Sequence, residues 1–178
     1  MFAAQRVVRM GHRLDALPGG FELALRHRQP LVSSPMAVTL TEAEVRLLQQ
    51  RATQVAENSY SPYSRFRVGA AILLENGEIV TGTNVENASY RLTTCAEQAA
   101  ITAAVAQFGP GIRIRAVAVA NLNGATCIPC GACRQTMLEF ADDSVPVFYP
   151  AATGEVVATT VGELLPAGFR LNTSAEDR

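Results

Sequence analysis

FRVGAAILLENGEIVTGTNVE, residues 66–86, contains two apolar runs separated by Asn76 and Gly77. Apolar runs of this length favour strands, and an Asn-Gly pair between two of them is typical of a tight β-hairpin turn. The stretch therefore predicts two antiparallel strands, at 66–75 and 78–86, and makes a β-sheet the centre of the fold.

The segments on either side predict helices that alternate with further strands. Residues 39–58 have apolar residues at helical spacing after a candidate capping box formed by Thr41 and Glu44. A hairpin followed by alternating helices and strands predicts a three-layer α/β/α fold around a mixed five-stranded sheet. The other expected elements are a helix that begins near Cys95 and ends at 108, a strand at 112–121, a helix at 129–141, strands at 145–150 and 155–160, and a short helix at 161–166.

The composition indicates one globular domain and excludes several kinds of chemistry. The chain has 178 residues, 48% of them hydrophobic, and a net charge of −1. Its scattered arginines predict no nucleic-acid partner, and no apolar run is long enough to predict a membrane span. The chain has no lysine, which excludes Schiff-base and P-loop lysines. Because His12 and His27 both lie near the N-terminus, a metal site in the core must use thiolates and a general base must be a carboxylate.

Residues 1–35 have little hydrophobic periodicity, and we interpret them as a mobile N-terminal extension before a catalytic domain at 36–178. Met36 is an alternative start for synthesis. The extension does not resemble a secretory signal, so we expect a cytoplasmic protein with reduced cysteines. In a reducing compartment, the four cysteines of the chain indicate metal binding or catalysis.

Three cysteines stand where connections become helices, in TTCAEQAAI and CIPCGACRQ. A helix N-terminus favours an anion such as a thiolate, and Cys130 and Cys133 share a helix face because they lie three positions apart. If the two helices lie side by side, Cys95 completes a three-thiolate site of the kind that holds catalytic zinc. Such a zinc lowers the pKa of its water, and Glu97 stands close enough in sequence to accept the proton.

Other readings of the cysteines remain open at this point. Cys130 and Cys133 alone could form a redox pair. Cys127 could join the other three cysteines in a structural four-cysteine zinc site. The run Cys127, Cys130 and Cys133 also has the spacing of part of an iron–sulfur cluster, although no adjacent fourth cysteine and proline follow it.

From Thr41 to Phe169 the sequence resembles the zinc-dependent cytidine deaminases of the small, homotetrameric, three-cysteine type. The motifs SPYSRFRVGAA, TGTNVENASY, TCAEQAAI, PCGACRQ and ELLPAGF carry the resemblance, in the order of that family. The resemblance implies one Zn²⁺ per chain on Cys95, Cys130 and Cys133, with Glu97 as the proton shuttle.

The resemblance also implies a nucleoside pocket. In it Asn84 and Glu86 bind the ribose hydroxyls, Phe66 packs on the base, and Phe169 reaches the base of a neighbouring subunit. The remaining implied substrate contacts are Asn87, Ala88 and Tyr90.

Three residues depart from the pattern of the resembled family. Gln98 stands where three-cysteine members usually carry an arginine that helps to neutralise the thiolates. Ile128 stands where a serine commonly precedes Pro-Cys, and Cys127 is an additional thiol close to the expected site.

The expected function is hydrolytic deamination of cytidine and 2′-deoxycytidine to the uridines with release of ammonia, for pyrimidine salvage. The expected partner is a small-molecule nucleoside, with no nucleic acid and no membrane, and the expected assembly is a homotetramer. The alternatives are a deaminase of a modified cytosine nucleoside, such as a blasticidin-type antibiotic, and a non-catalytic four-cysteine zinc module. Zinc stoichiometry and the activity of Glu97→Gln separate the module from the enzyme.

Overall fold

The computed structural model describes residues 40–171. The extension predicted at 1–35, with His12, His27 and the alternative start Met36, lies outside these residues. The elements are α1 (Glu42–Ala56), β1 (Val68–Leu74), β2 (Ile79–Thr83), η1 (Tyr90–Leu92), α2 (Ala96–Phe108), β3 (Ile114–Asn121), α3 (Gly131–Phe140), β4 (Pro146–Pro150), β5 (Val156–Thr160) and α4 (Val161–Leu164). None of the helices within 40–171 is long and apolar enough to cross a bilayer.

The five strands form one mixed sheet in the order β2-β1-β3-β4-β5. The predicted hairpin is confirmed, because β1 and β2 pair in antiparallel register with Ala71 opposite Thr81. β1 is also antiparallel to β3, β3 is parallel to β4, and β4 is antiparallel to β5. Every residue of β1 is buried, as expected of a central strand that is covered on both faces.

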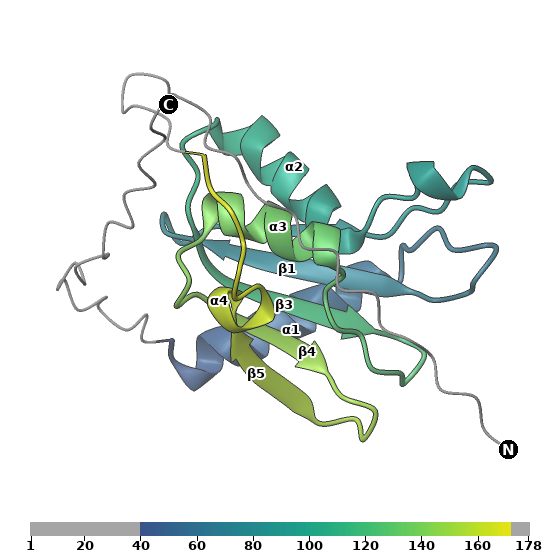
Figure 1. The fold of residues 1–178 in the computed structure, drawn as a ribbon. Coiled ribbons are helices and arrows are strands. Elements are labelled where there is room, and N and C mark those ends of the chain that lie inside the picture. The colour runs from purple at the N-terminus through teal and green to yellow at the C-terminus, as the bar shows by residue number, and fades with distance from the viewer. Residues whose placement is uncertain (1–39, 172–178) are drawn as a thin grey trace, which may run out of the picture. The chain divides into compact units, whose positions relative to one another are not determined.

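Helices cover the sheet on both faces (Figure 1). Leu48 and Ala52 of α1 pack against one face, on the side chains of alternate strand residues such as Ala71 and Leu73. The other face is covered by α2 and α3, whose buried residues form the larger core cluster with the intervening strand residues. The predicted three-layer α/β/α fold around a mixed five-stranded sheet is therefore confirmed.

Local hydrogen bonds set where the helices α1 and α2 begin. The predicted capping box is present at α1, where the Glu44 amide donates to Thr41 Oγ1 at 3.2 Å and the Thr41 amide donates to Glu44 Oε2 at 2.7 Å. α2 begins next to Cys95, as predicted, because Thr94 forms two backbone hydrogen bonds with Val85 before the helix starts. This bridge fixes Cys95 as the residue at which the chain turns into α2.

Gly82 brings the start of α2 directly onto β2. A Cβ at this position would overlap the backbone nitrogen of Ala100 and would lie 2.5 Å from the Ala96 carbonyl oxygen. Since only glycine permits this approach, the first turn of α2 is held against the sheet, and with it the cysteine that precedes it.

Candidate metal centre and nucleoside site

Two neighbouring helix starts carry the predicted metal ligands. Cys95 is the N-cap of α2 and Cys130 is the N-cap of α3, and neither side chain caps its own helix. Cys133 lies in the first turn of α3, on the face that points back toward Cys130. Since unpaired amide groups and the helix dipole favour negative charge at these positions, both helix starts suit thiolate ligands.

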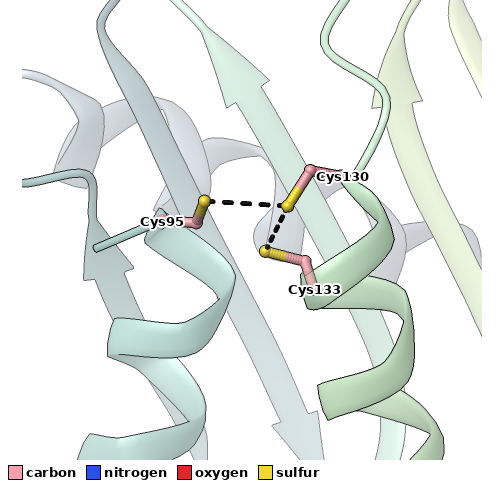
Figure 2. A group of neighbouring side chains, drawn as sticks. All are labelled: Cys95, Cys130 and Cys133. Atoms are coloured by element: carbon pink, nitrogen blue, oxygen red, sulfur yellow. Dashed lines mark hydrogen bonds between the residues drawn. The ribbon is translucent and has the colours of Figure 1, made fainter. Parts of the chain in front are cut away.

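The three sulfur atoms point toward one another (Figure 2). Cys130 Sγ lies 3.8 Å from Cys95 Sγ and 3.5 Å from Cys133 Sγ, and all three ligand atoms lie within 4.8 Å of one another. Tetrahedral zinc with Zn–S bonds of about 2.3 Å requires sulfur–sulfur separations of about 3.8 Å. All four cysteines of the chain are free thiols. The donor set and its spacing therefore fit a zinc ion, with a fourth position left for water.

The thiols of this cluster do not ionise alike. The hydrogen bond from Cys133 lowers the pKa of Cys95 to about 7, against the opposing effects of burial and of Glu97. The same bond, together with burial, raises the pKa of Cys133. The hydrogen bond between the two sulfur atoms thus stabilises a thiolate within the cluster.

Glu97 lies two residues beyond Cys95, in the first turn of α2 and among the core residues. It is 5% exposed. Burial raises its pKa, and its own backbone amide and the Cys133 thiol offset only part of this effect. A carboxyl group beside the sulfur cluster that is shielded from bulk water can hold and release a proton there.

The three residues that depart from the resembled pattern are adjacent or nearly adjacent in sequence to the site residues and are not part of the sulfur cluster. Cys127 packs against the core, and burial raises the pKa of its thiol to about 12. It is not a member of the cluster formed by the other three cysteines. Ile128 is exposed and Gln98 is half-buried.

Arg134 follows Cys133 and connects the segment before α3 to the end of α4. Its Nε donates to the Pro129 carbonyl at 2.7 Å, and its Nη1 donates to the Leu164 carbonyl at 3.0 Å. The guanidinium is thus fixed between the residue before Cys130 and the end of α4. The contact of Arg134 with the end of α4 joins residues 30 positions apart and has no signal in the local sequence.

Asn84 is buried and holds the loop that leads into β1. Its Oδ1 accepts from Ser59 Oγ at 2.6 Å and from the Val68 amide at 2.9 Å, and its Nδ2 donates to the Phe66 carbonyl at 2.8 Å. The predicted ribose ligand is therefore also a structural residue. One of its two amide hydrogens is not used in these bonds.

Glu86 is also buried, 9% exposed, and is surrounded by donors from the same loop. Its Oε2 accepts from the amides of Tyr63 at 2.9 Å and Ser64 at 3.2 Å, and its Oε1 accepts from the Ser64 hydroxyl. These bonds, led by that of the hydroxyl, lower the pKa of Glu86. These contacts of Ser59 and Ser64 were not predicted, although the motif SPYSRFRVGAA contains Ser64 and begins two residues after Ser59.

Phe66 lies on a stretch of backbone with an unusual conformation. Its neighbour Arg65 has φ +59°, in the left-handed region that non-glycine residues seldom occupy. Asn123 fixes this turn, because its Nδ2 donates to the Arg65 carbonyl and its Oδ1 accepts from the Arg67 amide, both at 2.9 Å. Phe66 itself is half-buried against the core.

The other predicted substrate contacts lie on the surface of the single chain. Asn87, Ala88 and Tyr90 are exposed, as is Phe169, whose exposed fraction is 66%. Asn87 turns the loop by accepting the Ser89 amide at 2.9 Å. The structure therefore brings together the sulfur cluster with Glu97 and, separately, the loop around Asn84 and Glu86. It leaves Tyr90 and Phe169 of the predicted pocket exposed.

Comparison with known proteins identifies similar sequences and structures. The family model for the cytidine and deoxycytidylate deaminase zinc-binding region matches residues 43–149. A cytidine deaminase from Sporosarcina psychrophila is 42% identical over 127 residues, which cover 71% of this chain and 91% of that protein. The crystal structure of a cytidine deaminase from Burkholderia pseudomallei is 40% identical, with a TM-score of 0.65, over 73% of this chain and 100% of that chain.

A more distant relative has a different substrate in its name. The blasticidin-S deaminase of Bacillus cereus is 30% identical over 115 residues, which cover 61% of this chain and 81% of that protein. The similarity thus extends beyond enzymes that are named for cytidine.

Proposed function

The chain belongs to the cytidine and deoxycytidylate deaminase family, and on that premise we propose which of its residues deaminate cytidine and how they do so. The enzyme is a hydrolase that converts cytidine to uridine and ammonia, and we extend this activity to 2′-deoxycytidine. One observation carries the assignment to this site: three thiols 3.5–3.8 Å apart at two helix starts, with the buried Glu97 beside them.

Cys95, Cys130 and Cys133 hold one zinc ion per chain. Bound zinc supplies the Lewis acidity that makes water a nucleophile near neutral pH. Glu97 takes one proton from the water whose oxygen adds to C4 of cytosine and delivers it to N3. It then takes the remaining proton from the C4 hydroxyl and passes it to the amine, so that the C–N bond breaks, ammonia leaves and the C4 carbonyl of uridine forms. Because Glu97 is shielded from solvent, each of these transfers occurs within the site.

Asn84 and Glu86 bind the ribose through the hydrogen-bonding positions that their contacts with the loop leave unused. Asn84 uses three of its hydrogen-bonding positions for the loop and keeps one amide hydrogen for a hydroxyl oxygen. Glu86 accepts three hydrogen bonds, while a carboxylate can accept about four, so one position is left for a ribose hydroxyl. The protein thereby holds both groups in place before the nucleoside arrives.

The base is enclosed by Phe66 of the same chain and by Phe169 of a second chain, and Asn87, Ala88 and Tyr90 line the pocket. Exposed aromatic side chains are characteristic of association surfaces, and Phe169 and Tyr90 are 66% and 81% exposed. We therefore propose a homotetramer, acting in the cytoplasm in pyrimidine salvage, with no nucleic-acid partner.

Residues 36–178 constitute the catalytic domain in this proposal. The family match at 43–149 lies within these limits. Deleting residues 1–35 is expected to leave zinc content and cytidine turnover unchanged. An insoluble or inactive truncated protein would assign the extension a part in folding or catalysis.

The function is tested by the loss of cytidine absorbance with the purified, zinc-loaded full chain. Cys130→Ala is expected to lose both zinc and activity, whereas its matched control Cys127→Ala retains about one zinc per chain and full turnover. Zinc loss from both variants would favour the structural four-cysteine module. Zinc binding without turnover would refute the deaminase.

Blasticidin S is the second substrate to be tested, because a relative of that name is 30% identical. The pairing of Asn84 with Glu86 favours a nucleoside with free ribose hydroxyls, so cytidine is expected to have the higher kcat/KM. The reverse order would assign the enzyme to the modified nucleoside.

A further inference from the structure

Phe169 combines an exposed ring with a backbone that is held in place. Phe169 belongs to the segment that follows α4, which passes across α3 (Figure 1). Its side chain is 66% exposed, although consecutive residues of the segment, from 168 to 170, are each in contact with α3 or with the chain directly after it. Exposed aromatic residues on unanchored segments must be ordered when they bind, and this ring needs no such ordering.

Gly168 sets how closely the segment approaches α3. A Cβ at this position would overlap Cδ2 of Leu138 and would lie 2.9 Å from Cδ2 of Leu165. The backbone of Gly168 is therefore packed directly against the side chain of Leu138 in α3. This contact holds the segment on the same helix that carries the proposed ligand Cys133.

Gln135 and Arg170 hold the segment on either side of the ring. Gln135 lies two residues after Cys133 and donates through Nε2 to the Phe169 carbonyl at 2.9 Å. Arg170 donates to the carbonyl of Leu138 and, through Nη2, to the Ala141 carbonyl at 3.0 Å.

The α3 end accepts these bonds because the last carbonyl groups of a helix have no partner within it. Arg170 also forms an ion pair of 2.7 Å with Asp143, just beyond the helix. The Arg170 guanidinium thus donates to three acceptors, the carbonyls of Leu138 and Ala141 and the carboxylate of Asp143. Its planar set of N–H donors suits this arrangement better than the single ammonium group of a lysine would.

We propose that Arg170, with Gln135, is a positioning residue for substrate binding, which fixes the backbone of Phe169 so that its ring is presented in one direction to the nucleoside site of a second copy of this chain. The inference rests on the proposed function, in which that ring encloses the neighbour's base. Holding a binding group in its bound conformation improves binding by lowering the cost of ordering it. Because the Phe169 ring contacts the base equally in the ground state and the transition state, loss of Arg170 should raise KM and leave kcat unchanged.

Steady-state kinetics of the zinc-loaded full chain test this with Arg170→Ala, Phe169→Ala and the double variant. Arg170→Ala is expected to raise KM for cytidine by about threefold to tenfold, the range of an aromatic contact, with kcat within about twofold of wild type. Arg170→Lys, which keeps the charge for Asp143, should recover part of the loss. Arg46→Ala is the matched control, because Arg46 forms only an exposed ion pair with Glu42 on α1, and it should leave KM unchanged.

The double variant separates positioning from general stability. If Arg170 acts through Phe169, removing it has no further effect on KM once the ring is gone. Additive effects on KM, a fall in kcat, loss of zinc, or dissociation of the tetramer in Arg170→Ala would overturn the inference. An unchanged KM in Phe169→Ala would instead refute the shared pocket, and absence of wild-type turnover would refute the deaminase itself.

Discussion

Glu97 and Glu86 are two buried carboxyl groups whose surroundings differ in opposite directions. Their exposed fractions are 5% and 9%. Burial raises the pKa of Glu97 at the start of α2, whereas the Ser64 hydroxyl and two backbone amides lower the pKa of Glu86 after β2. Hydrogen bonds to the charged form favour ionisation and desolvation opposes it.

The difference assigns the two groups to different tasks. Glu86 is held ionised and in one place by the loop at Tyr63 and Ser64, which suits a fixed acceptor for a hydroxyl group. Glu97 lies beside three thiols in an environment that favours the neutral acid, which suits a group that exchanges a proton. Two groups of the same chemical type thus divide binding and catalysis by environment, and the predictions below test that division.

The largest effect is expected at Glu97. Glu97→Gln keeps the size of the side chain and removes its proton transfer, so cytidine turnover should fall by at least the ~10²–10⁴-fold typical of a general acid–base group. Zinc content by elemental analysis and the circular dichroism spectrum should remain those of the wild type. Near-normal turnover in this variant would falsify the assignment of Glu97 to catalysis and remove the contrast with Glu86.

A smaller effect of a different kind is expected at Glu86. Glu86→Gln loses a charge-assisted contact to the ribose, so KM should rise by about tenfold to a hundredfold, with much less change in kcat.

Ser64→Ala is the matched control, because it removes one of the loop donors and leaves the carboxylate. It should raise KM less than Glu86→Gln. Equal effects would mean that Glu86 acts only by holding the loop. Asn84→Ala is less informative, since it would also leave the buried Val68 amide without its acceptor.

The lowered pKa of Glu86 should make the free energy of unfolding depend on pH. A carboxyl group with a depressed folded-state pKa contributes stability that is present above its unfolded value of about 4.3 and is lost as pH falls through the folded value. The difference in unfolding midpoint between wild type and Glu86→Gln should therefore be constant from about pH 7 to 5 and shrink below about pH 4.

Urea unfolding at a series of pH values measures this difference. The zinc ligands take up protons alike in both variants, so the comparison isolates Glu86. A difference that grew on acidification would reverse the sign of the shift and the contrast with Glu97.

The fold and the sulfur cluster were accessible to sequence analysis because their signals are local. The Asn76-Gly77 turn, the capping box at Thr41 and the position of cysteines at helix starts each depend on a few adjacent residues. The three-layer arrangement then follows from the order of helices and strands.

The hydrogen bonds that hold the loops were not accessible, because they join residues far apart in the chain. Ser59 meets Asn84 across 25 positions, Arg67 meets Asn123 across 56, and Gln135 meets Phe169 across 34. No periodicity marks such pairs. In the second and third pairs one partner is a main-chain group, which every residue contains. The prediction of Asn84 and Glu86 as ribose contacts came from resemblance, and their role in holding the loop came only from the structure.

The smallest expected effect concerns Gln98, directly after Glu97. Three thiolates carry more negative charge than one zinc ion balances, and each helix N-terminus offsets this by only about 0.3–1 kcal/mol. Gln98 supplies no charge at the position where the resembled enzymes usually carry arginine. Gln98→Arg should therefore slow the loss of zinc to a chelator by about twofold to fivefold, corresponding to one further interaction of that size.

Gln98→Leu controls for packing in this experiment and should retain zinc no better than wild type. Cytidine turnover and the elution volume on gel filtration should be unchanged in Gln98→Arg. Faster zinc loss from the arginine variant would contradict the charge argument. It would imply that Arg134 and the two helix starts already balance the thiolates, and that a further cation only repels the metal.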